Sequence, residues 1–185
     1  ALLLLVQLPA QQHAFKQLTP KDGLAQSQVR AIAQDASGYL WFGTLGGASR
    51  FDGQLFENYA LQEGLPDAQV SALVAQKDGT IWMASGSVLV HSVGTHWLKE
   101  PLPITSGGAR IMALATDTNG RLYVGTDGGG LFVRDSRGLR PLEGFPADTA
   151  KNVRALLALP DGRVLIGLRN GLLVWKSGAC SAVQL

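Results

Sequence analysis

The sequence is poor in the residues that build disulfide frameworks, nucleic-acid surfaces and long helices. It contains one cysteine, Cys180, so no internal disulfide framework is available. Its 16 basic and 14 acidic residues nearly balance. No Lys/Arg cluster stands out among them, which argues against a nucleic-acid partner. No stretch of useful length carries a convincing helical period, so a helical domain is excluded as well.

Glycine, by contrast, is abundant, with 23 residues among the 185 of the chain. Leucine, with 29 residues, and valine, with 13, are also well represented. This composition suits many short strands joined by tight turns. With 46% hydrophobic residues the chain can bury one sizeable core, so a single domain is the default expectation.

The first ten residues, ALLLLVQLPA, differ from everything that follows. This apolar run is too short to span a bilayer, and it fits the hydrophobic region of a secretory signal peptide. We therefore predict that residues 1–14 are a signal-peptide remnant, with cleavage after Ala10 or Ala14; a buried strand is the alternative. An exported domain nearly free of cysteine points to a bacterial periplasm or cell surface.

An internal repeat organises the rest of the sequence. Its four copies align on an apolar anchor residue at spacings of 41, 41 and 42 residues: Val29, Val70, Ile111 and Val153. Two residues after each anchor lies an alanine: Ala31, Ala72, Ala113 and Ala155. Nine residues after each anchor lies a glycine: Gly38, Gly79, Gly120 and Gly162. Twelve residues after each anchor lies a large apolar residue: Trp41, Trp82, Tyr123 and Leu165.

Each copy reads as four short antiparallel strands. In the first copy these are 29–34, 40–44, 48–51 and about 55–59, separated by turn residues. Four short strands in about 41 residues match one blade of a β-propeller. The sequence thus predicts an all-β propeller whose blades cover residues 29–69, 70–110, 111–152 and 153–185, the fourth being truncated.

Small residues have a place in such a blade. The alanines suit an innermost strand that is crowded against its neighbours around the axis. The glycine two residues after the large apolar position (Gly43, Gly125 and Gly167) is expected to let a facing aromatic side chain approach the backbone.

The two ends of the repeat array allow two ways in which the propeller ring could be completed. Phe15 lies fourteen residues before the first anchor, where later copies have Phe56, Trp97 and Leu139, so residues 15–28 are predicted to be an outer closing strand and linker. In one alternative, the tail ACSAVQL supplies the fourth strand of the last copy and the ring continues. In the other, residues 15–18 close a four-bladed ring.

The repeat resembles that of the two-component regulator propeller family. The phrase carrying the resemblance is V-x-A-I-x-Q-D-x-x-G-Y-L-W-F-G-T-x-G-G-x-x-R-F-D-G at 29–53, together with GLAQSQV at 23–29 and GLPDAQV at 64–70. The likeness is strong in the first three copies. The fourth departs from it, with Leu165 in place of the aromatic residue and Leu168 in place of threonine.

This resemblance implies a seven-bladed propeller in the periplasmic ectodomain of an inner-membrane receptor, which can be a dimer. In that family a β-sandwich, a transmembrane helix and an output module follow; the output is a histidine kinase, sometimes in a hybrid system, or a diguanylate cyclase. The present chain is accordingly expected to be a non-catalytic sensor segment. Its implied partners are neighbouring blades, other receptor domains and an extracytoplasmic ligand, for which a glycan is one option.

No catalytic residue, metal site or cofactor is predicted. The glycine-rich stretches TLGG (44–47) and TDGGG (126–130) lack the lysine and the following helix of a phosphate-binding loop. DTNG (117–120) lacks the further oxygen ligands of a calcium loop. The three histidines have no recognisable catalytic motif beside them.

Candidate ligand-binding residues lie where the chain enters each innermost strand. Loops that gather on a rigid scaffold are common binding sites. The polar residues beside the anchors are Gln28, Arg30, Gln69, Arg110, Asn152 and Arg154. Such groups would suit a sugar or another polar solute, although they could equally satisfy loop backbone or line a wet channel.

Two other functions remain open at this point. One is a propeller lyase similar to streptogramin lyases, whose repeats also carry a D-x-x-G-x-L-W phrase; it would need a His/Glu acid–base set on one face. The other is a protein-interaction scaffold.

Overall fold

The computed structural model describes residues 15–103, 109–148 and 150–183, so the predicted signal-peptide remnant lies outside it. The described residues form four sheets, each of four antiparallel strands in chain order. The first sheet holds β1 (Val29–Gln34), β2 (Leu40–Thr44), β3 (Gly47–Phe51) and β4 (Phe56–Tyr59). The second holds β5 (Val70–Ala75), β6 (Ile81–Ser85), β7 (Val88–Val93) and β8 (His96–Glu100).

The remaining two sheets repeat this plan. The third holds β9 (Arg110–Thr116), β10 (Leu122–Asp127), β11 (Leu131–Asp135) and β12 (Gly138–Pro141). The fourth holds β13 (Val153–Ala158), β14 (Val164–Leu168), β15 (Gly171–Lys176) and β16 (Ala179–Ala182). A single 3₁₀ turn, η1 (Pro20–Asp22), precedes them, and no helix of the described chain has the length and hydrophobicity needed to cross a membrane.

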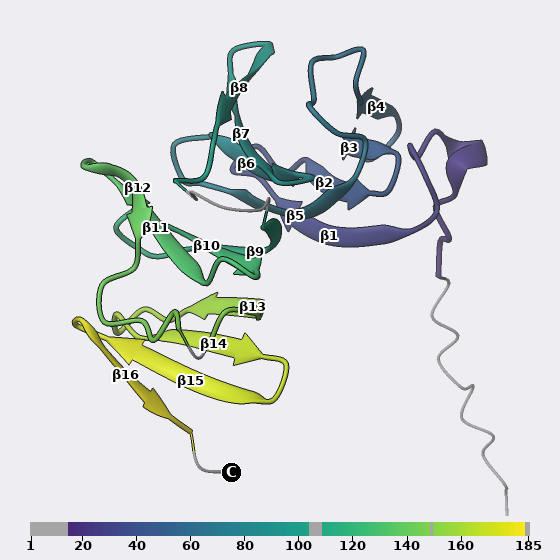
Figure 1. The fold of residues 1–185 in the computed structure, drawn as a ribbon. Helices are drawn as coiled ribbons and strands as arrows, with labels where there is room; N and C mark the ends of the chain where they lie inside the picture. Colours follow the sequence, from purple (N-terminus) through teal and green to yellow (C-terminus); the bar gives the residue numbers. More distant parts are fainter. Residues whose placement is uncertain (1–14, 104–108, 149, 184–185) are drawn as a thin grey trace, which may run out of the picture.

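The four sheets are successive blades of a β-propeller, as the sequence predicts. Figure 1 shows them following one another from the purple first blade to the yellow fourth. The innermost strands contact one another in the order β1, β5, β9, β13. The end blades do not close this series, because Ile32 on β1 is 63% exposed and Leu157 on β13 is 55% exposed. The alternative of a closed four-bladed ring is therefore wrong.

The hydrophobic core lies between neighbouring blades rather than inside any one sheet. Three clusters of buried residues join the first blade to the second, the second to the third and the third to the fourth. The anchors make this plain: Val70, Ile111 and Val153 are fully buried, whereas Val29 is 37% exposed. Val29 is the one anchor of the four with no preceding blade in the structure.

Each turn from the first to the second strand of a blade is closed by the repeated glycine. In the first blade the amide of Gly38 donates to the carbonyl of Asp35 at 3.0 Å. Gly38 has φ of 89°, a left-handed conformation that residues with a Cβ rarely adopt. This requirement explains why the glycine recurs nine residues after every anchor.

The ends of the array differ from two expectations. The fourth blade is not truncated, because β16 pairs with β15 and completes the sheet, so the tail is a fourth strand. Residues 15–19 form no strand, and Phe15 is 95% exposed. Every described blade already has its own outer strand, which leaves no sheet here for residues 15–18 to complete.

The expected role of the second-strand glycines also needs correction. A Cβ placed on Gly43 would lie 2.9 Å from Val70 Cγ1, and one on Gly125 would lie 2.5 Å from Val153 Cγ1. The neighbour is thus the anchor valine of the next blade, not an aromatic ring. No blade follows Gly167 within the described residues, and a Cβ there would meet Ala155 of its own blade at 3.2 Å.

Candidate functional site

The predicted binding residues lie at the start of the innermost strands. Arg110 begins β9, and Arg30 and Arg154 are the second residues of β1 and β13. Four of the six side chains are exposed and two are half-buried. The exposed ones are Gln28, Arg30, Arg110 and Arg154, and the half-buried ones are Gln69 and Asn152.

The structure brings four of the six together across three blades. The guanidinium of Arg110 donates to Gln69 Oε1. Arg154 forms an ion pair with Asp127, with 3.1 Å between Nη2 and Oδ2. Asp127 also lies opposite Arg110 in the β9–β10 register and forms an isolated bridge with Asn152. We call Gln69, Arg110, Asp127, Asn152 and Arg154 the inner-edge cluster.

Gln28 and Arg30 stand apart from this cluster. The amide of Gln28 donates to the side-chain oxygen of Gln26, within its own loop. Among the contacts of the described residues, none joins Gln28 or Arg30 to the inner-edge cluster. Both lie at the start of the first blade, on the face that has no preceding blade in the described structure.

Asp127 is the residue that sequence reasoning missed. It belongs to the TDGGG stretch, where the glycines indicate a turn and draw attention away from the carboxylate. The available signal was its distance from the anchor: Asp127 follows Ile111 by sixteen residues, at the end of the second strand. With two arginines and one aspartate among amide groups, the inner-edge cluster offers donors and acceptors to a polar solute.

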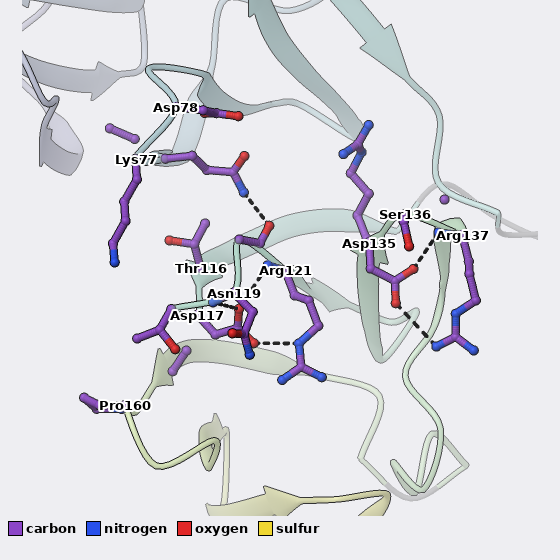
Figure 2. Close-up of a pocket in the computed structure, with 17 residues that line it drawn as sticks. Lys77, Asp78, Thr116, Asp117, Asn119, Arg121, Asp135, Ser136, Arg137 and Pro160 are labelled. Carbon is purple, nitrogen blue, oxygen red and sulfur yellow. Dashed lines mark hydrogen bonds and ion pairs between the residues drawn. The ribbon is translucent and has the colours of Figure 1, made fainter.

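A second polar surface is a large open hollow of about 1190 Å³ formed by turns of the second, third and fourth blades. Figure 2 shows its labelled side chains, with Asp117 directed toward Arg121 and Asp135 toward Arg137. None of the six predicted binding residues lines this hollow.

Two of the three carboxylates that line the hollow, Asp117 and Asp135, are already neutralised by arginines of the chain, whereas Asp78 accepts from the backbone amide of Thr80 at 2.9 Å. Asp117, whose side chain is 4% exposed, accepts from Arg121 Nε at 2.6 Å and from two backbone amides. Asp135 pairs with Arg137 and Arg140. The backbone amide of Arg137, followed by its side chain, lowers the pKa of Asp135. Burial raises the pKa of Tyr123, which donates to Asp117, to about 12. These interactions hold the turns in place.

Comparison with known proteins agrees with this architecture. The family model described as "Two component regulator propeller" matches residues 23–46. Residues 23–46 are similar to a two-component regulator propeller repeat. The matched segment runs from the loop before β1 through the turn after β2, and thus includes Gln28, Arg30 and Trp41.

One curated relative is named histidine kinase P4, from Formosa agariphila. It is 53% identical over 45 residues, which are 24% of this chain and 3% of that protein. The extracellular domain of a hybrid two-component system from B. thetaiotaomicron has a TM-score of 0.72 and 22% identity, covering 85% of this chain and 22% of that chain. Virginiamycin B lyase from Staphylococcus aureus has a TM-score of 0.69 and 15% identity, covering 85% of this chain and 56% of that chain.

At these identities the two solved structures show the fold, a β-propeller, and the present chain spans about a fifth of the receptor domain. Both the fold class and the resemblance to the regulator-propeller family are confirmed. The ligand-binding role of the six residues stays a prediction.

Proposed function

We propose that this chain is part of the sensor propeller of a bacterial two-component receptor and is not itself an enzyme. The observation that carries the proposal is the regulator-propeller repeat at residues 23–46, within a chain that shares a 45-residue stretch with a histidine kinase at 53% identity. The propeller lies on the periplasmic side of the inner membrane. The kinase, hybrid system or diguanylate cyclase that it controls belongs to the rest of the receptor.

The inner-edge cluster is the ligand site of this proposal. Its residues come from the second, third and fourth blades, so a ligand held there contacts several blades at once. A polar solute can replace the exposed contacts of Arg110 and Arg154 with its own oxygens. A ligand that binds one blade arrangement better than another shifts the receptor between its states. A glycan fragment has the required hydroxyl groups.

Thermal denaturation of the complete receptor ectodomain, screened against oligosaccharides, tests the ligand class. A stabilising glycan should lose its effect in Arg110→Ala and Arg154→Ala. It should keep its effect in Arg163→Ala, which removes an exposed arginine paired with Asp161 in the fourth blade. If no carbohydrate shifts the transition, the glycan part of the proposal is refuted; a shift unchanged in both variants refutes the site.

Fusions to the complete receptor test the location and the class of function. Alkaline phosphatase fused after the propeller should be active, and green fluorescent protein at the same place should be dark. The reverse pattern contradicts a periplasmic sensor.

The competing lyase function is tested by incubating the ectodomain with a streptogramin B antibiotic. Opening of the antibiotic's ring would overturn the non-catalytic proposal.

A further inference from the structure

A groove of about 380 Å³ lies between the first and second blades and is lined by four aromatic side chains. Tyr39, Trp41 and Tyr59 come from the first blade, and Trp97 comes from β8 of the second. Trp41 is only 5% exposed, whereas the other three rings are half-buried and reach the surface. We call this feature the aromatic groove. None of the six predicted binding residues lines it.

One of the four rings, that of Trp97, stands nearly perpendicular to two others. Trp41 and Tyr59 are stacked, with centroids 5.5 Å apart and planes 22° apart. Trp97 is nearly perpendicular to both, at 87° to Trp41 and 82° to Tyr59. An aromatic face carries partial negative charge. Perpendicular rings at a groove therefore suit a cation better than an anion.

The charged side chains that line the aromatic groove carry a net negative charge, which also suits a cation. They include the carboxylates Asp35 and Glu57 and one arginine, Arg50. With histidine left out of the count, as in the formal net charge of +2 for the whole chain, this is a surplus of one negative charge. Asp35 is fixed in place because its Oδ2 accepts from the indole nitrogen of Trp41 at 2.8 Å.

The chain already places a cation of its own on these rings. The guanidinium carbon of Arg50 lies 4.7 Å from the centroid of the Tyr39 ring and 5.9 Å from that of Trp41. Arg50 Nη2 also pairs with Glu57 Oε2 at 2.5 Å. The Arg50 side chain is 36% exposed and that of Glu57 is 53% exposed, so an external group can compete for the same partners.

Tyr59 remains an uncharged part of the wall. Burial, and then its hydrogen bond with Glu57, raise the pKa of the Tyr59 hydroxyl to about 12. The negative charge available to a ligand is therefore that of Glu57 and Asp35, next to neutral rings.

We propose that the aromatic groove binds a small organic cation, an ammonium or methylated ammonium group, and that Arg50 is its intramolecular competitor. The ligand would contact the faces of Tyr39, Tyr59 and Trp97 and pair with Glu57 after Arg50 moves away. This site is separate from the inner-edge cluster. It extends the proposed sensor function by giving the propeller a second kind of input.

Titration of the 185-residue chain with tetramethylammonium and with choline, at constant ionic strength, tests the proposal by isothermal calorimetry. The decisive variant is Arg50→Ala. Removing the competitor should tighten binding about fivefold, whereas removing a residue that merely shapes the groove would weaken it. Trp97→Leu and Glu57→Gln should each weaken binding about fivefold to tenfold.

Arg163→Ala is the matched control, since it also removes an exposed arginine paired with a carboxylate, but on the fourth blade. It should leave the affinity for both cations unchanged. Circular dichroism and the melting temperature of each variant confirm that the fold is intact. Because Arg50→Ala is expected to strengthen binding, loss of folding cannot imitate the expected result.

Three results would overturn the proposal. One is weaker or unchanged binding in Arg50→Ala. Another is no heat from either cation in the folded wild-type chain. The third is preferential binding of glucose, a neutral ring that would gain hydrogen bonds from Arg50 and lose them in Arg50→Ala. None of these bears on the fusions that test the receptor assignment, so the two proposals fail separately.

Discussion

Replacement of Gly125 by alanine tests how closely two blades approach. The added Cβ would lie 2.5 Å from Val153 Cγ1, 3.0 Å from Val153 Cβ and 3.2 Å from Leu156 Cδ1. Val153 is fully buried between the third and fourth blades, so it has no free space into which to move. Overpacking of this kind costs about 1–3 kcal/mol. Alanine also restricts the unfolded chain more than glycine does, and this raises the unfolding free energy by about 0.4–1 kcal/mol. The net loss of unfolding free energy in the variant should therefore be about 1–2 kcal/mol.

Urea denaturation of the chain measures this loss, and Gly171→Ala provides the matched control. Gly171 likewise lies in a strand of a blade, as the first residue of β15, but a Cβ there would meet no atom within 4 Å. Gly171→Ala should therefore leave the midpoint unchanged or raise it slightly. The contrast separates the effect of the blade contact from any general effect of alanine in a strand.

A double-mutant cycle identifies the contact responsible. Val153→Ala alone should destabilise the chain, because it opens a cavity at a fully buried site. In combination with Gly125→Ala the two losses should be less than additive, by about 1 kcal/mol, because the smaller side chain makes room for the new methyl group. Strict additivity, or a Gly125→Ala variant as stable as the wild type, would refute the close approach.

Two further predictions concern pH and assembly. Burial lowers the pKa of His91 below 6.5, with Glu100 raising it and Arg134 lowering it, so the unfolded chain takes up a proton first as pH falls. The stability that this provides is fully present above about pH 6.5 and declines as the pH falls below that value. His91→Phe should flatten that decline in urea midpoints, and an equal decline in both proteins would contradict it. The end faces carrying Ile32 and Leu157 should make the chain self-associate. Light scattering should show less association in Ile32→Glu and Leu157→Glu, and a wild-type monomer at high concentration would be evidence against it.

The strands of the fold could be predicted because their signals are local. The first two strands of the first blade lie where the sequence places them, and the next two begin within one residue of the expected positions. Alternation of side chains and the turn glycine are both set by neighbours along the chain. In the fourth blade the first three strands begin at the same distances from the anchor as in the first blade, even though its motif is weak.

Contacts between blades could not be predicted in the same way, because they depend on how far apart two sheets lie. The glycine at 125 indicates that something approaches closely, but only the structure identifies Val153. In the same way, Asp127 joins the predicted binding residues through Arg154, which belongs to the next blade. Residues 15–18 occupy the same repeat position as the later outer strands. They could form a strand only by pairing with a sheet that lacks an outer strand, and each described sheet already has one.

The weak fourth copy of the repeat also has a physical explanation. In the first three blades an aromatic donor on the second strand binds an acceptor six residues earlier, at the start of the turn. The pairs are Trp41 with Asp35 at 2.8 Å, Trp82 with Gln76 at 3.1 Å and Tyr123 with Asp117 at 3.3 Å. In the fourth blade both positions are leucine, Leu165 and Leu159.

A buried indole or phenol needs a hydrogen-bond partner, so losing one member of such a pair is costly. Replacing both members by apolar residues removes the donor and the need for an acceptor together, and this can be nearly neutral. The turn itself is kept, because the amide of Gly162 still donates to the carbonyl of Leu159 at 3.1 Å. The fourth copy therefore departs from the motif at the two positions that can change as a pair, and keeps the glycine that the backbone requires.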